Sequence, residues 1–212
     1  MGNPKTTVVL IDGRNLGGAF QEWRGYRLEK IIFNIIDEIK NKLDIEMELI
    51  RVYYHYSQIT KLSEKIPEEY REKWAREKER TDSFLNDIAK IPRWDVICGI
   101  RIPRYNDELD RWFLAEKGVD MRLGINLVKL SNRYEVIILV SGDTDYCYAI
   151  STAKDAGKPE LCIVVAIPGN QLSQDLVNSA DLHLRITEQH IIAAGGQKRM
   201  EAHKRGEKPK EK

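Results

Sequence analysis

Two uninterrupted aliphatic runs, at residues 8–11 and 136–140, mark strands of a buried sheet. Runs of this length without alternating polar positions are typical of strands covered on both faces, as in a parallel sheet. We therefore predict strands over residues 6–11 and 135–140. Comparable apolar stretches predict further strands over residues 47–54, 94–102, 161–167 and 181–186.

Apolar residues at helical spacing predict an amphipathic helix over residues 28–43. This helix joins the first two predicted strands, so it forms a right-handed crossover between parallel strands. The same pattern predicts helices over residues 120–130, 146–156 and 172–178, with Gly157 closing the second of these. Strands alternating with helices in this way predict an α/β fold.

Residues 61–91 break this pattern with dense charge of alternating sign. Opposite charges three or four positions apart predict a long exposed helix, and Tyr70, Trp74 and Ile88 give it a thin apolar stripe. We interpret the segment as a charged helical insertion or an elaborated connection. It either covers one sheet edge as a solvated helix or serves as a substrate-facing arm or dimer contact.

A hairpin is predicted after this segment, with a polar turn at residues 106–108 and a return strand over 111–115. Its basic residues surround an aromatic side chain: Arg101, Arg104 and Arg111 lie near Tyr105. Cations that bind the backbone and rings that stack on bases suit single-stranded nucleic acid. The alternative is a solvated hairpin tip.

The length of 212 residues predicts one α/β domain over residues 1–194, followed by a disordered basic tail over 195–212. A net charge of +1 provides no bulk attraction to nucleic acid, so any such surface needs local clustering of cations. The sequence has no apolar stretch of membrane-spanning length and no signal-peptide pattern. The three widely spaced cysteines are expected to be buried free thiols, which suits the cytoplasm.

Each of the two aliphatic runs ends near an aspartate beside a glycine. Asp12-Gly13 follows the first run, and residues 141–145, Ser-Gly-Asp-Thr-Asp, follow the second. Carboxyl ends of parallel strands meet at one edge of a sheet, where ligands bind. Clustered carboxylates repel one another unless a cation is bound, and Mg²⁺ prefers oxygen ligands. The pattern therefore predicts a site for a hard divalent cation.

Each acid can also serve a purely local structural role. Asp12 and Asn15 can satisfy backbone amides in a turn, and Asp120 can cap the helix that follows Gly118. Helix capping can also account for Asp143 or Asp145, although it does not readily account for both. As a site, Asp143 is the better direct ligand, and Asp145 binds the ion or a metal-bound water.

These residues resemble the motifs of NYN domains, which are PIN-like nucleases, and look closest to the LabA-like branch. The matching segments are residues 11–16, 116–120 and 139–146, within a resemblance that spans about residues 7–186. The resemblance implies a PIN-like three-layer sandwich with a mostly parallel central sheet and RNA cleavage that depends on Mg²⁺ or Mn²⁺. It assigns catalytic and metal-binding roles to Asp12, Asp120, Asp143 and Asp145.

One position departs from the family pattern. Family members often carry a second acid six positions after the middle aspartate, where this chain has Asn126. On an ideal helix Asn126 lies about 120° from Asp120, at the margin of the site, and its amide adds no charge for a second ion. The remaining substrate-binding candidates supply cations or polar groups around the aspartates: Arg14, Asn15, Lys117, Arg122 and Ser141.

The sequence thus predicts an endoribonuclease that hydrolyses single-stranded or structured RNA by in-line attack of a metal-activated water. No nucleophilic triad competes, and the histidines are expected to be structural or exposed: His55, His183, His190 and His203. One alternative is a non-catalytic RNA-binding or adaptor module with the same fold. Another is a phosphotransfer or sugar-nucleotide enzyme that binds its metal through Asp143 and Asp145. RNA is the expected partner, a membrane is not, and a homodimer is left open.

Overall fold

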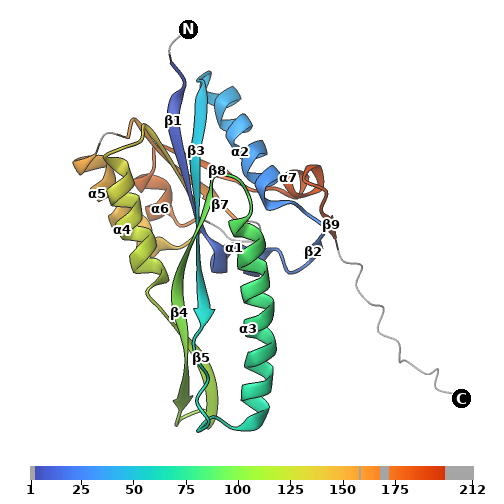
Figure 1. Cartoon of the computed structure of the whole chain (residues 1–212). Helices are drawn as coiled ribbons and strands as arrows, with labels where there is room; N and C mark the ends of the chain where they lie inside the picture. The colour runs from blue at the N-terminus through green and yellow to red at the C-terminus, as the bar shows by residue number, and fades with distance from the viewer. Residues whose placement is uncertain (1–2, 158, 168–171, 199–212) are drawn as a thin grey trace, which may run out of the picture.

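Seven strands form one central sheet with helices on both faces (Figure 1). The computed structural model describes residues 3–157, 159–167 and 172–198. The strand order is β5-β4-β3-β1-β6-β7-β8, and all neighbours are parallel except β4 and β5. The predicted mostly parallel α/β fold is therefore confirmed. The strands are β1 (Lys5–Asp12), β3 (Met47–Ile59), β4 (Trp94–Asn106), β5 (Arg111–Lys117), β6 (Val136–Val140), β7 (Leu161–Ala166) and β8 (Leu182–Arg185).

The direction of chain progression reverses between β1 and β6. After β1 the chain builds β3, β4 and β5 on one side, and then β6, β7 and β8 on the other. Because β1 and β6 are parallel neighbours, Ile11 lies beside Val140 at their carboxyl ends. Open α/β sheets bind ligands at such a reversal, where the loops diverge and leave a crevice.

Two helical layers cover the sheet. The helices α2 (Leu28–Leu43) and α7 (Glu188–Ala193) pack on one face, where Val9 and Ile11 belong to the same core. The helices α4 (Val119–Ser131), α5 (Cys147–Ala156) and α6 (Gln174–Ser179) cover the other face, with Val8 and Leu10. Successive residues of a strand point to opposite faces, so the aliphatic run of β1 supplies both cores at once. The result is a three-layer sandwich.

The helix α3 (Glu68–Ala89) is the crossover between the parallel strands β3 and β4, so the predicted charged helix connects two neighbouring strands of the sheet. It begins later than predicted, because Pro67 occupies the N-cap position. Trp74, Leu85 and Ile88 are buried as it packs against both strands. The helix was predicted to cover one edge of the sheet, whereas α3 packs on β3 and β4, and β5 is the edge strand on that side.

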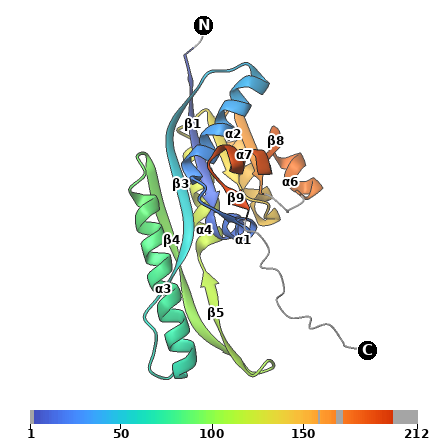
Figure 2. The same cartoon turned by 90° about the vertical axis from the view of Figure 1, so that its right-hand side faces the viewer.

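The β4–β5 hairpin and α3 extend together away from the rest of the molecule (Figures 1 and 2), and we call them the arm. A separate small core buries Ile59, Ile66 and Trp74 there, with Trp112 and Leu114 packed against it. The strands β3 and β4 run to Ile59 and Asn106, beyond their predicted ends, because each finds a pairing partner along the arm.

Several short elements were not predicted. They are α1 (Gly13–Ala19), β2 (Trp23–Arg24), the 3₁₀ helix η1 (Thr144–Tyr146), α7 and β9 (Gln197–Lys198). Because β9 pairs with β2, the predicted disordered tail begins too early at residue 195, and residues 199–212 lie outside the described part.

The described helices include none that is long and apolar enough to cross a membrane. All three cysteines are free, as predicted. Only Cys162 is buried, however, while Cys98 and Cys147 are partly exposed.

Candidate active site

Asp12 ends β1 and caps α1. Its side chain is 4 % exposed, and its Oδ1 accepts a hydrogen bond of 3.1 Å from the backbone N–H of Asn15. Arg14 and Asn15 therefore lie in a helix and not in the predicted loop. Gly13 has no room for a side chain, since a Cβ atom there would lie 2.5 Å from Cζ of Tyr54. The turn after β1 is thus pressed directly onto β3.

Hydrogen bonds connect this turn to the turn after β6. The Ser141 hydroxyl donates to Oδ2 of Asp12 over 3.2 Å, and the backbone N–H of Gly142 donates to Oδ1 of Asn15 over 3.2 Å. Ser141 also accepts from the N–H of Asp143. Asn15 and Ser141 therefore hold the two turns together and orient the carboxylate of Asp12.

Asp143 caps η1, because its Oδ1 accepts a hydrogen bond of 3.0 Å from the N–H of Asp145. The capping alternative thus holds for Asp143, while its Oδ2 takes no part in this bond. Asp145 is exposed at the rim. Capping accounts for one acid of this turn and not for the second, as the sequence indicated.

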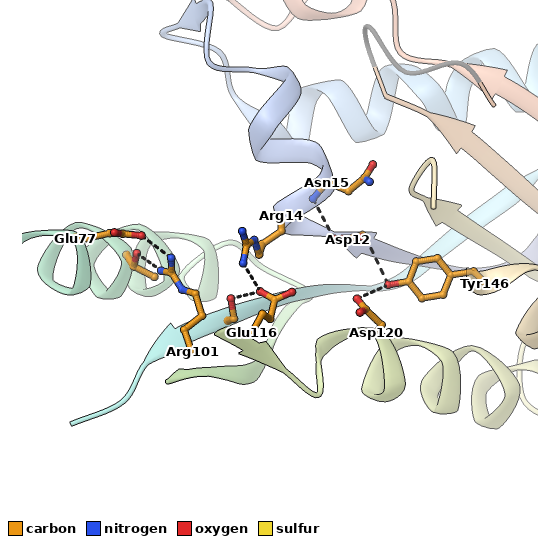
Figure 3. Close-up of polar contacts among 10 residues, drawn as sticks. Asp12, Arg14, Asn15, Glu77, Arg101, Glu116, Asp120 and Tyr146 are labelled. Atoms are coloured by element: carbon orange, nitrogen blue, oxygen red, sulfur yellow. Dashed lines mark hydrogen bonds and ion pairs between the residues drawn. The ribbon is translucent and has the colours of Figure 1, made fainter. Parts of the chain in front are cut away.

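Asp120 does not cap α4, so that interpretation was wrong. Gly118 occupies the N-cap position, and no side chain caps this helix. Instead, Oδ1 of Asp120 lies 3.3 Å from the hydroxyl oxygen of Tyr146 (Figure 3). The same hydroxyl lies 3.5 Å from Oδ2 of Asp12. One hydroxyl has one proton, so it can donate to only one of the two carboxylates at a time.

Tyr146 is a site residue that sequence reasoning missed. It is 1 % exposed, and a single aromatic residue at the start of a predicted helix looks like a core residue. The available signal was its hydroxyl, because a buried tyrosine normally needs a hydrogen-bond partner.

The carboxylates carry uncompensated charge. Burial raises the pKa of Asp12, hydrogen bonds from Asn15 and Ser141 partly oppose this, and the charges of Asp120 and Asp143 raise it further. Burial also raises the pKa of Asp120, as do the neighbouring acids. In the described part of the chain, no lysine or arginine forms an ion pair with Asp12, Asp120, Asp143 or Asp145.

The predicted cations have different surroundings. Arg14 binds Oε2 of Glu116 over 3.1 Å (Figure 3). The Ser57 hydroxyl donates to the same oxygen. Glu116 belongs to the matched middle segment, but the sequence did not reveal that it holds Arg14. Lys117 and Arg122 are exposed and remain available to a substrate.

The predicted basic stretch on the hairpin is smaller than expected. Arg101 is 7 % exposed and paired with Glu77 of α3, so it leaves the stretch (Figure 3). Arg104 and Arg111 are exposed, and the Tyr105 hydroxyl donates to Asp110.

Asn126 contacts a buried histidine instead of an aspartate. Its Nδ2 lies 3.1 Å from Nε2 of His55, which is paired in register with Asp12. Burial lowers the pKa of His55 to about 4, so this side chain is neutral at neutral pH. Both results agree with the prediction of a marginal Asn126 and a structural His55. The remaining histidines are an exposed His183, a His190 at the start of α7, and His203, which lies outside the described part.

The oxygen donors fit a hard cation, although they do not form a closed ligand set. Among residues 3–157, 159–167 and 172–198, no group of three or more acids, histidines or cysteines is arranged to hold a metal ion. Mg²⁺ and similar ions keep several waters and need only one or two carboxylates from the protein. An incomplete set of carboxylates without cationic partners suits such an ion.

We call the four aspartates Asp12, Asp120, Asp143 and Asp145 the acidic edge, and the three-layer sandwich that carries them is consistent with a PIN-like fold. The family model of the NYN domain matches residues 6–187, so the chain belongs to the NYN domain family, within the superfamily of PIN-like nucleases. No curated protein matches the sequence.

A crystal structure of a protein of unknown function from Vibrio parahaemolyticus is similar in fold. The TM-score is 0.55 and the identity 15 %, over 89 % of this chain and 96 % of the other. At this identity the likeness concerns the fold alone.

Proposed function

We propose that the protein is a cytoplasmic, metal-dependent endoribonuclease of the LabA-like branch that hydrolyses single-stranded or structured RNA. One observation carries this proposal. Four aspartates from the end of β1, from α4 and from the turn after β6 gather at the strand reversal, without a cation paired to them among the described residues. Membership of the NYN family supports a nuclease-type activity.

The aspartates Asp12, Asp120, Asp143 and Asp145 would hold Mg²⁺ or Mn²⁺. A bound ion supplies an activated water and stabilises negative charge on the phosphoryl group. Asn15 and Ser141 fix the carboxylate of Asp12, and the Tyr146 hydroxyl sets its position relative to Asp120. The exposed Lys117 and Arg122 bind backbone phosphates of the RNA, which positions the strand without reading its sequence.

Cleavage of a labelled RNA with a stem-loop and single-stranded flanks, in Mn²⁺, tests this function. We expect Asp143→Asn to lose at least about 100-fold in rate, since even residues that support metal ligands typically contribute 10- to 100-fold. Asp37→Asn, on the exposed side of α2, is the matched control and should cleave like wild type. Equal cleavage by Asp143→Asn would reveal a contaminating nuclease and contradict the proposal.

A non-catalytic RNA-binding module is the second candidate, and two contacts favour it. Asn126 is neutral and bound to His55, and Arg14 is paired with Glu116 instead of facing the aspartates. RNA binding without cleavage in Mg²⁺, Mn²⁺ and Co²⁺ would support this candidate. Metal-dependent turnover that Asp143→Asn abolishes would exclude it.

A further inference from the structure

A small cavity walled by aromatic rings lies next to the first turn of α1. Its volume is about 80 Å³, and Gly13 lines it directly after Asp12. The described residues that line it include no charged side chain. Five rings form most of the wall: Phe20, Tyr26, Tyr54, Tyr56 and Phe84.

The rings contact one another by stacking and by edge-to-face packing. Tyr54 and Tyr56 are stacked, with centroids 6.1 Å apart and an interplanar angle of 16°. Phe84 stands edge-on to both, at 5.9 Å and 6.4 Å. Despite these contacts Phe84 remains 41 % exposed, while Tyr26 and Tyr56 are partly exposed. Phe84, Tyr26 and Tyr56 therefore leave ring surface next to the cavity that a ligand could contact.

The cavity adjoins the acidic edge through β1. Tyr54 pairs in register with Ile11, the residue before Asp12, and its hydroxyl lies 3.5 Å from the carbonyl oxygen of Gly13. Val8 and Leu10 face the α4 layer, so alternation along the strand points Asp12 to that layer as well. The cavity lies on the α2 side. The two sites therefore share one sheet edge but occupy its opposite faces.

We propose that this cavity binds one unpaired nucleobase of the RNA strand whose phosphate lies at the acidic edge. The proposal rests on the proposed function and narrows its substrate to RNA with an unpaired base beside the cleaved bond. A neutral wall of rings does not suit a phosphate or an ion, whereas bases stack on aromatic side chains whatever their sequence. A volume of about 80 Å³ admits only the edge of one base, so the face of that base would stack on a partly exposed ring, Phe84. Bases in a duplex are already stacked and paired, so they cannot enter.

Binding of fluorescein-labelled U10 and A10 in EDTA, followed by anisotropy, tests the cavity without cleavage. Phe84→Ala should weaken binding of at least one strand by about five- to 150-fold, the range for loss of a stacking aromatic. Binding of a ten-base-pair RNA duplex should not change. Phe33→Ala is the matched control, because Phe33 is also a half-exposed helical phenylalanine but lies outside the cavity.

Two further variants separate stacking from folding. Phe84→Trp keeps a flat ring and should retain binding, while Phe84→Leu keeps an apolar side chain and should bind as weakly as Phe84→Ala. Abasic substitutions along the tighter-binding strand then locate the base. One abasic position should weaken binding to wild type, and the same substitution should have no further effect on Phe84→Ala.

If Phe84→Ala and Phe33→Ala both bind every strand as tightly as wild type does, the proposal is overturned. Its failure is distinct from failure of the nuclease function. If RNA binding depends on the ring at position 84 but no metal-dependent cleavage occurs, the nuclease function is contradicted and the base site is supported. If the Phe84 variants bind and cleave RNA like wild type, only the base site is contradicted.

Discussion

The arm and the acidic edge differ in whether their acidic side chains have cationic partners. On α3 most of the acids form ion pairs with nearby cations, as in the pairs Arg71–Glu68, Arg76–Glu72 and Lys78–Asp82. At the acidic edge, the carboxylates of Asp12, Asp120 and Asp143 contact hydroxyls or backbone amides, and no lysine or arginine of the described part pairs with these three or with Asp145. Exposed pairs change stability little, whereas burial near other carboxylates, as at Asp12, disfavours the charged form of an acid. The charges of α3 therefore have little net effect, although that helix is dense in charge. The functional edge is instead marked by carboxylates that have no cationic partner.

The largest stability effect should come from the pair of Arg101 with Glu77, in which the arginine side chain is buried. Arg101→Met leaves Glu77 without its partner and removes a contact of 3.4 Å to the hydroxyl of Thr81. We expect a loss of about 2 kcal/mol in the free energy of unfolding, less than for a fully buried pair because Glu77 is partly exposed. Urea denaturation measures this loss.

The control is Arg76→Met, which removes an exposed pair of the same helix and should cost less than about 0.5 kcal/mol. Cleavage by both folded variants should equal that of wild type, because neither pair touches the aspartates. Equal stability of the two variants would contradict the difference in burial. Slower cleavage would contradict the separation of arm and edge.

A smaller effect is expected at the acidic edge from Tyr146→Phe, which deletes only the hydroxyl between Asp12 and Asp120. Residues that orient metal ligands typically contribute 10- to 100-fold to metal affinity or activity. We therefore expect about a tenfold increase in the Mn²⁺ concentration for half-maximal cleavage, with about 1 kcal/mol lost in stability. Titrating Mn²⁺ in the cleavage assay measures the shift.

Tyr148→Phe changes a tyrosine that is 83 % exposed on α5 and serves as its control. A Tyr146→Phe protein that needs no more Mn²⁺ than Tyr148→Phe does would show that the hydroxyl only fills the core.

The smallest effect concerns pH and the metal-free fold. The pKa values of Asp12 and Asp120 are raised in the folded state. An acid whose pKa is higher in the folded state stabilises that state as pH falls through the folded pKa. This stabilisation is complete below the pKa of the unfolded state, which is near 4. It is lost as pH rises through the folded pKa. Asp12→Asn removes this penalty, so in EDTA at pH 7 it should melt about 2–4 °C above wild type.

Melting curves in EDTA between pH 7 and 4 test this sign, and the advantage of Asp12→Asn should shrink toward acid. Excess Mn²⁺ should stabilise wild type more than the variant, since a ligand stabilises the state that binds it. A variant that melts several degrees below wild type in EDTA would show that the hydrogen bonds of Asp12 outweigh its repulsion.

Much of the fold was predictable where burial alone decides the structure. Residues 8–11 and 136–140 are apolar at every position because both faces of β1 and β6 are covered. The helix α1 was not predictable, since glycines at 13, 17 and 18 oppose helix formation, and the burial of Leu16 and the cap from Asp12 stabilise it. The end of β3 was also missed, because its alternating polar residues become a strand only through pairing with β4.

The site was predictable as far as topology fixes it. Asp12 and the turn after β6 meet because their strands are parallel neighbours. The contacts of Arg14 with Glu116 and of Tyr146 with Asp120 depend on which side chains approach from distant elements, and sequence spacing does not contain that information. The cap of α4 passed to Gly118, whose φ of 79° suits a residue without a side chain.

The close approach of Gly13 to the Tyr54 ring has an evolutionary consequence. The two residues stand 41 positions apart, yet a methyl group added at position 13 would overlap the ring. Among relatives of this chain, any larger residue at position 13 should occur with a smaller residue at position 54. The residues at positions 13 and 54 should then change together during evolution. Covariation between these two columns of an alignment would reveal the coupling.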